Sequence, residues 1–142
     1  KRGFMGSDYQ VFILLLLLGG MLFFPAVVAP AIFSSLEEKY SGALLRRLFP
    51  NYYLFIIALS LIAGLLGDLG SATTGACVFI LLTTVFVRQI LMPKINNWRD
   101  EELDGNSDSG RKFARSHRFT VYLNLLQIVL IIYSVLAKID LV

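Results

Sequence analysis

Hydrophobic residues gather into four long runs along the chain, and short charged stretches separate these runs. The runs cover residues 9–33, 49–66, 72–92 and 119–137. A helix needs about 20 apolar residues to cross the hydrocarbon core of a bilayer, and each run comes close to that length. Inside the runs the only charged residue is Arg88, which lies near an end. The pattern predicts an all-α integral membrane protein, a four-helix bundle in which each run is one span.

Composition supports the same class of protein. Of the 142 residues, 56% are hydrophobic and 16% are charged, and the mean hydropathy is +0.70. A soluble domain this apolar would expose large hydrophobic patches. The runs use more than half of the chain, so a single domain over residues 1–142 is expected. The net charge of +3 does not indicate a nucleic-acid partner, because the basic residues flank the runs, where cations meet lipid headgroups.

The segment 34–48 predicts a short amphipathic helix that lies in the membrane interface. Its hydrophobic residues recur at every fourth position, at Leu36, Tyr40, Leu44 and Leu48. Ser35, followed three residues later by Glu38, matches a capping box at the start of a helix. The charged residues Glu37, Glu38, Lys39, Arg46 and Arg47 mostly point to other sides, as in helices that lie along a membrane surface. A plain polar connector is the alternative.

Prolines and glycines predict where the spans bend and end. Pro25 predicts a kink in the first span, because it removes one backbone hydrogen bond and crowds the preceding turn. Pro50 fits the first turn of the second span, and Pro93 is expected to end the third. Residues 67–71 predict a tight turn. The stretch 100–112 is acidic and rich in glycine and serine, and it predicts a solvated loop, since it lacks the closing glutamate of a calcium loop.

The distribution of Lys and Arg predicts the topology. With four spans, the termini and the turn at 67–71 share one side, which carries Lys1, Arg2 and Lys138. The other side carries the larger set of Lys39, Arg46, Arg47, Lys94, Arg99, Arg111, Lys112, Arg115 and Arg118. Cytoplasmic loops are enriched in Lys and Arg. We therefore expect both termini outside and the two larger loops in the cytoplasm. The run 9–33 is longer than the apolar part of a signal peptide, so we expect it to stay as a span.

The candidate site is a stripe of polar side chains at one end of the spans. On one helical face lie His117, Thr120, Asn124 and Gln127, and Arg88 and Gln89 approach the same end from the third span. Polar groups in hydrocarbon need partners, so this face should point into the bundle. The cluster could bind a small anion or a headgroup, or relay protons. It could equally join helices by hydrogen bonds.

Other chemistry finds little support in the sequence. Cys77 is the only cysteine and His117 the only histidine, so neither a thiolate cluster nor a pair of axial haem ligands is available. Ser34 and Ser35 have no histidine and acid pattern around them that fits a catalytic triad. We predict no catalytic residues, no metal and no cofactor, and hence no enzyme.

Four segments carry a family resemblance: GGMLFFPAVVAPAIFSSL, RRLFPNYYLF, VRQILMPKIN and FARSHRFTVYLNLL. In this order they resemble the successive signatures of the transmembrane protein 205-like family, whose bacterial members are described largely as a domain of unknown function. The resemblance implies a four-helix protein of the bacterial inner membrane with motif residues near the cytoplasmic interface, and no established reaction. The motif residues at that interface are Leu48, Phe49, Pro50, Tyr52, Tyr53, Pro93 and Phe113. A weaker likeness to the copper-resistance D-type membrane domain would require metal ligands that this chain mostly lacks.

Two functions follow from these observations. The chain is expected to be a non-catalytic accessory or structural subunit that docks in the membrane against other membrane-protein subunits. The alternative is binding or transport of a small solute, ion or metal through the polar cluster facing the cytoplasm.

Overall fold

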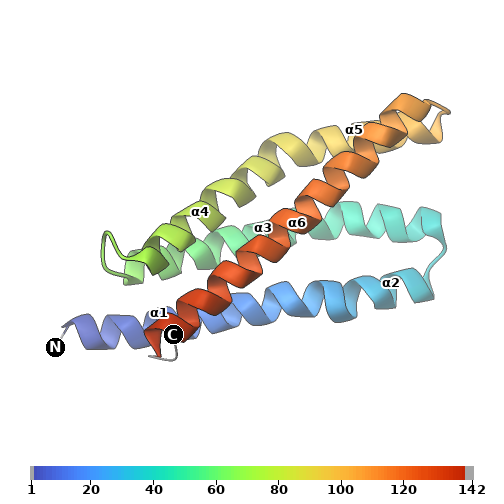
Figure 1. Cartoon of the computed structure of the whole chain (residues 1–142). Helices are drawn as coiled ribbons and strands as arrows, with labels where there is room; N and C mark the ends of the chain where they lie inside the picture. Colours follow the sequence, from blue (N-terminus) through green and yellow to red (C-terminus); the bar gives the residue numbers. More distant parts are fainter. Residues whose placement is uncertain (1, 140–142) are drawn as a thin grey trace.

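The computed structural model describes the backbone of residues 2–139 and the side chains of residues 8–139. These residues form helices joined by short connections (Figure 1). The α-helical and π-helical (η) elements, in chain order, are α1 (Arg2–Phe23), η1 (Phe24–Val28), α2 (Ala29–Ser35), α3 (Glu38–Leu66), α4 (Ala72–Phe86), η2 (Val87–Leu91), α5 (Met92–Leu103) and α6 (Ser107–Lys138). Because each η element continues the helix before it, the elements make four long rods.

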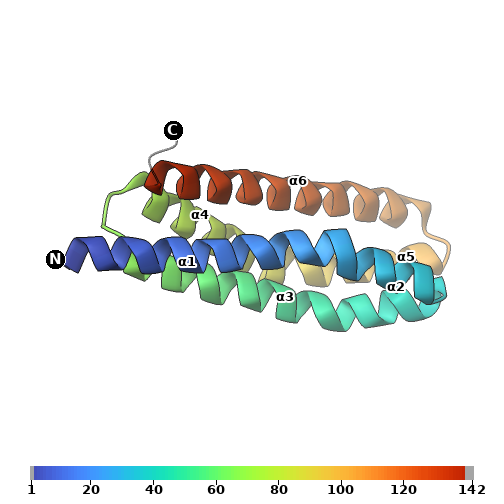
Figure 2. The same cartoon turned by 90° about the horizontal axis from the view of Figure 1, so that it is seen from below.

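The rods lie side by side in an up-and-down bundle (Figures 1 and 2). The start of α1, the α3–α4 turn and the end of α6 lie at one end, which we call the termini end. The α2–α3 and α5–α6 connections lie at the other, the loop end. α3 packs against α1 and α4, while α6 packs against α1, α4 and α5. This antiparallel order follows from the short connections between successive rods.

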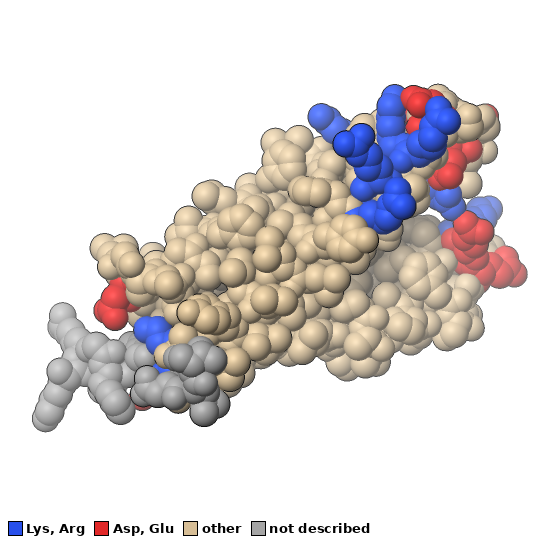
Figure 3. Space-filling view, viewed as in Figure 1, with Lys and Arg blue, Asp and Glu red and all other residues tan. Residues whose placement is uncertain are grey.

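The surface has the character of a membrane-spanning protein. Four helices are long and apolar enough to cross a membrane: Asp8–Ser35, Glu38–Leu66, Ala72–Leu103 and Ser107–Lys138. On the face drawn in Figure 3, the charged side chains lie at the two ends of the bundle, with an uncharged belt between them. Large hydrophobic side chains such as Phe12, Leu65 and Val129 are exposed within these helices. The prediction of an all-α fold with four apolar spans is confirmed.

The predicted interfacial helix at 34–48 is wrong. The first rod ends at Ser35 and α3 begins at Glu38, after which it continues through Pro50 to Leu66. Residue Glu37, with extended backbone, is the N-cap, so the capping box of Ser35 and Glu38 does not form. Pro50 removes only the hydrogen bond to the carbonyl of Arg46, four residues earlier. The turns before it are held by packing, since Ser41 and Leu45 are buried.

The predicted end of the third span at Pro93 is also wrong, as is the loop at 100–112. Pro93 lies in the first turn of α5, and the π-helical turn η2 precedes it. Helix α5 then continues to Leu103, and α6 begins at Ser107. The side chain of Asn106 caps α6 by accepting hydrogen bonds from the backbone N–H groups of Asp108 and Ser109. The residues predicted as a solvated loop therefore form the end of α5, a tight turn and the start of α6.

The irregularity predicted at Pro25 takes the form of the π-helical turn η1. Pro25 and Pro30 each lack the N–H group that would continue the α-helical ladder. The N–H of Ala29 instead donates to the carbonyl of Phe24, one residue farther back than in an α-helix. The rod thus passes two prolines without ending.

Close packing in the core depends on small residues at helix crossings. A Cβ atom added to Gly20 of α1 would overlap the ring of Phe55 of α3. A Cβ on Gly64 would lie 3.5 Å from the Cβ of Cys77 of α4. Small residues let helix backbones approach closely, and the resulting van der Waals packing is one of the forces that associate helices in lipid. Around these contacts lie the fully buried side chains Leu14, Leu17, Met21, Ile56, Ile80 and Ile131.

Candidate functional site

The C-terminal part of the predicted polar stripe, at Gln127, points into the bundle. Gln127 of α6 is buried, and its Nε2 donates to the hydroxyl of Thr83 at 2.9 Å and to that of Thr84 at 3.2 Å. Both threonines belong to α4. The predicted inward position of Gln127 is therefore explained by hydrogen bonds between α6 and α4.

One turn away, Asn124 joins a third helix. Its Nδ2 donates to the hydroxyl of Tyr52 of α3 at 3.3 Å. Beside this contact lies a cavity of about 10 Å³, which is lined by Tyr53, Thr84, Val87, Thr120, Leu123, Asn124 and Gln127. A space of this size is close to the minimum for one water molecule. The inner polar groups can thus hold at most a very small ligand.

His117 does not join this group. Its side chain is exposed, and its ring stacks on that of Phe113 one turn earlier, with centroids 5.9 Å apart and planes at 10°. Figure 1 shows α6 running toward α5 and away from α1 and α2 at the loop end. This divergence leaves the face that carries His117 without a covering helix. The hydroxyl of Thr120 donates to the carbonyl of His117 within the same helix.

Arg88 and Gln89 occupy a separate site on η2. The Nε of Arg88 donates to the carbonyl of Pro50 on α3 at 3.1 Å, and its Nη1 donates to the Oε1 of Gln89 at 3.2 Å. An open groove of about 310 Å³ lies here, between the half of α3 nearer the loop end and the segment formed by η2 and the start of α5. It is lined by Arg46, Pro50, Arg88, Gln89, Met92, Pro93 and Asn96. The six polar residues predicted as one cluster therefore fall into an inner group, the exposed His117 and this groove.

Three of the predicted interfacial aromatic residues, Phe49, Tyr52 and Tyr53, form a cluster, and Phe24 joins them. The ring of Phe24 of η1 stacks on Tyr52 with centroids 4.5 Å apart, and Phe49 stacks on Tyr53 at 5.9 Å. Leu48, which precedes Phe49 in the chain, is partly buried. Phe113 lies apart on α6, where the guanidinium of Arg99 is 5.3 Å from its ring centroid. Nothing in the sequence pattern indicates that Phe24 joins the cluster, because this residue lies among many apolar residues of the first run.

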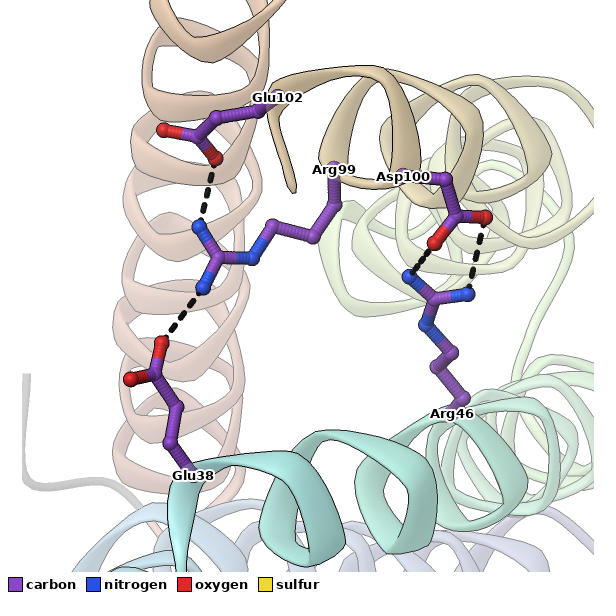
Figure 4. A network of polar contacts seen from close by, with 5 residues as sticks. All are labelled: Glu38, Arg46, Arg99, Asp100 and Glu102. Carbon is purple, nitrogen blue, oxygen red and sulfur yellow. Dashed lines mark hydrogen bonds and ion pairs between the residues drawn. The ribbon is translucent and has the colours of Figure 1, made fainter. Parts of the chain in front are cut away.

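Ion pairs tie α3 to α5 at the loop end, and sequence reasoning did not find them (Figure 4). Arg46 bonds to Asp100 through two atoms, Nη1 to Oδ2 at 3.1 Å and Nη2 to Oδ1 at 2.5 Å. Arg99 bridges Glu38 at 2.7 Å and Glu102 at 2.6 Å. The partners Arg46 and Asp100 lie 54 residues apart. Only their shared position at a span end could have suggested the pairing.

At the termini end, Gln10 of α1 is a further polar contact that sequence reasoning missed. It is fully buried, and its Nε2 donates to the backbone carbonyl of Ala63 on α3 at 2.9 Å. Its Oε1 has no hydrogen-bond partner within the described residues. A Cβ on Gly67 would overlap both the amide nitrogen of Gln10 and the hydroxyl of Thr74. The signal was a lone amide at the start of an apolar run.

Metal ligands do not gather anywhere in the part of the chain that the structure describes. No three His, Cys, Asp or Glu side chains there lie in an arrangement that could hold a metal ion. Cys77 is buried in the core beside Gly64. Its surroundings fit a small hydrophobic side chain.

These features define the class: a small four-span membrane protein with a hydrogen-bonded polar interior and charged ends. Residues 12–103 match the family described as a domain of unknown function, DUF4149. This match covers more than half of the chain, so the chain belongs to that family. A search of curated proteins and a search of solved structures gave no match.

Proposed function

We propose that this protein is a non-catalytic accessory or structural subunit, which docks in the membrane against a larger complex. The observation that carries the proposal is the use of the intramembrane amides. Gln10, Asn124 and Gln127 all donate hydrogen bonds to other helices of the same bundle. Such bonds fix the register of helices. They support a rigid module whose outer faces are free for lipid or protein.

The exterior supports the same function. Exposed aromatic side chains occur along α1 and α6, with Phe12 and Phe23 on α1 and Tyr122 and Tyr133 on α6. The connections between rods are short, so the described residues form no sizeable domain outside the helices. A protein of this shape offers most of its surface within the bilayer, where another membrane protein could pack against it. The resemblance to the transmembrane protein 205-like family adds no reaction to this proposal.

The proposed orientation places the loop end in the cytoplasm and the termini end outside. It is supported by the excess of Lys and Arg at the loop end, seen on the face drawn in Figure 3. The proposed location is the inner membrane of a bacterium.

Co-purification tests the docking function. The tagged protein is extracted at native expression with a polymer that keeps a ring of lipid, and bound proteins are quantified by mass spectrometry. We expect a defined partner set in constant stoichiometry. The control is a variant with Phe12→Leu and Tyr122→Leu, which reduces the outward aromatic surface but leaves the core unchanged. A lone bundle in both samples would contradict the proposal.

One specific observation supports a second function, the binding of a small solute or ion. Arg88 lines the open groove, and no carboxylate of the described residues lies within ion-pair distance of its guanidinium. Ionisable side chains within membrane spans are costly and often mark a binding site. The position of His117, outside the inner group, gives no support to a continuous polar path through the bundle.

A further inference from the structure

We propose that the groove at the loop end binds a phosphate group between Arg88 and Arg46. This inference deepens the second function above, binding, and does not depend on docking to a partner. The first step is the charge balance. Arg88 interacts with a backbone carbonyl and a neutral amide, so in the described structure its positive charge has no anionic partner. An anion in the groove would supply one.

The free donors of Arg88 point to phosphate chemistry. A guanidinium carries five N–H donors in a fixed fork. Arg88 uses its Nε donor on Pro50 and one Nη1 donor on Gln89, which leaves the Nη2 group without a partner among the described residues. The two contacts hold the side chain in place across α3 and η2. A planar fork that is already positioned suits the paired oxygens of a phosphate.

The second arginine of the groove is held by a carboxylate. Arg46 lines the same groove, and Asp100 occupies two of its nitrogens. This ion pair is partly exposed, with 38% of the Arg46 side chain and 55% of the Asp100 side chain accessible. Exposed pairs contribute about 0–1 kcal/mol, so a stronger anion can compete for the guanidinium. Asp100 therefore lowers the affinity of the empty groove for phosphate and does not block it.

The depth of the groove matches the headgroup region. Pro50, the residue that anchors Arg88, lies between Phe49 and Tyr52 of the aromatic cluster. Aromatic side chains of membrane proteins concentrate at the level of the lipid headgroups. A phosphate reaching the groove could come from an anionic lipid, as in the basic pockets between transmembrane helices that hold such lipids. It could also come from a small soluble phosphate.

The walls of the groove fit a phosphate with an attached organic group. Asn96 and Gln89 supply amide groups beside the arginines, while Met92, Pro50 and Pro93 supply apolar surface. Neither proline has an N–H group, so the helix has one backbone donor fewer at each of these positions. A carbonyl left without its helical partner there could accept a hydrogen bond from a hydroxyl group of a headgroup such as glycerol. The volume of about 310 Å³ is at the lower end for small-molecule sites.

Lipid titration of the purified full chain in detergent tests the site. Short-chain phosphatidylglycerol is added, and bound lipid is counted by native mass spectrometry. We expect Arg88→Gln to weaken binding by about tenfold or more, the effect of losing a charged hydrogen-bond donor. Arg115→Gln is the matched control, because Arg115 is exposed at the same end without an ion pair in the described structure. Equal affinity of Arg88→Gln and the wild type, or an equal loss in both variants, would overturn the proposal.

A second variant keeps the test decisive if Arg88→Gln does not fold. Asp100→Asn frees Arg46 and is expected to tighten lipid binding several-fold, whereas Asp108→Asn, an exposed control at the same end, leaves it unchanged. No change in Asp100→Asn, or equal tightening in both, overturns the assignment. Inorganic phosphate distinguishes the sources. If it displaces the lipid, a small phosphate is the ligand, and if it does not, the lipid headgroup is.

The two proposed functions fail separately. Arg88→Gln removes the phosphate site but leaves the apolar exterior unchanged, so a docked complex would still purify with it. Loss of lipid binding with retained partners supports both functions. Retained lipid binding in Arg88→Gln overturns only the site.

Discussion

Gln127 of α6 is hydrogen-bonded to Thr84 of α4 within the buried interior of the bundle, with Nε2 and Oγ1 3.2 Å apart. The same nitrogen donates to Thr83 at 2.9 Å. In a medium that offers no water, a buried amide must find its partner within the protein. The contact therefore selects one alignment of α6 along α4.

Replacing Gln127 with leucine should destabilise the bundle by about 1 kcal/mol, within the range measured for hydrogen bonds between membrane helices. The substitution keeps a similar volume and removes both donors. Unfolding in mixed micelles with increasing denaturing detergent, followed by circular dichroism, measures the change. Thr120→Val is the control, because the Thr120 hydroxyl bonds only within its own helix. Equal losses in the two variants would argue against an interhelical role for Gln127.

The neighbouring glycines Gly19 and Gly20 should respond to alanine in opposite ways. A Cβ on Gly20 would overlap the ring of Phe55, whereas a Cβ on Gly19 would meet no atom within 4 Å. Overpacking a core contact costs about 1–3 kcal/mol, while alanine in an open helical position is favoured over glycine by up to about 1 kcal/mol. We expect Gly20→Ala to lower the thermal midpoint in detergent and Gly19→Ala to leave it equal or higher.

The packing explanation for Gly20 has its own test. Phe55→Leu, added to Gly20→Ala, shortens the side chain that the new methyl group meets. The double variant should recover part of the lost stability. If the two substitutions lower the midpoint additively, Phe55 is not the source of the loss.

The spans could be predicted from the sequence because lipid permits few alternatives. An apolar run of about 20 residues must form a helix to satisfy its backbone. The ends of the spans were harder to predict from the sequence. Pro50 and Pro93 were interpreted as helix boundaries, but each removes a single hydrogen bond, and tertiary packing and a π-helical turn carry the helix past them. Rules based on the local sequence around a proline do not include the effect of tertiary packing or of a π-helical turn.

Part of the candidate site could be predicted from the sequence for a similar reason. Spacing placed Asn124 and Gln127 on one face, and both lie inside the bundle. His117 shares that face but is exposed, because a helical face has the same neighbours along its length only if the helices stay parallel. The pairing of Arg46 with Asp100 depends on the meeting of α3 and α5, which spacing within one helix does not reveal.

The ion pair of Arg46 and Asp100 should contribute modestly to stability. A double-mutant cycle with Arg46→Gln and Asp100→Asn isolates the coupling between the two side chains. Because both are partly exposed, we expect a coupling energy of about 0.5–1 kcal/mol that falls as salt is raised. The measurement is unfolding in mixed micelles at low and high sodium chloride. A coupling that does not change with salt would mean that the contact is not mainly electrostatic.

The two ends of the bundle should be labelled from opposite sides of the membrane. Cys77, the only cysteine, is buried and can be replaced by alanine, after which single cysteines are introduced by Asp68→Cys and Arg111→Cys. Asp68 lies in the α3–α4 turn at the termini end, and Arg111 lies in the first turns of α6 at the loop end. A membrane-impermeant maleimide added to intact cells should modify the cysteine at 68 and reach that at 111 only after the membrane is opened, because the end rich in Lys and Arg is expected in the cytoplasm. Modification of both in intact cells would contradict the four-span arrangement, and the reverse pattern would keep the spans but invert the orientation.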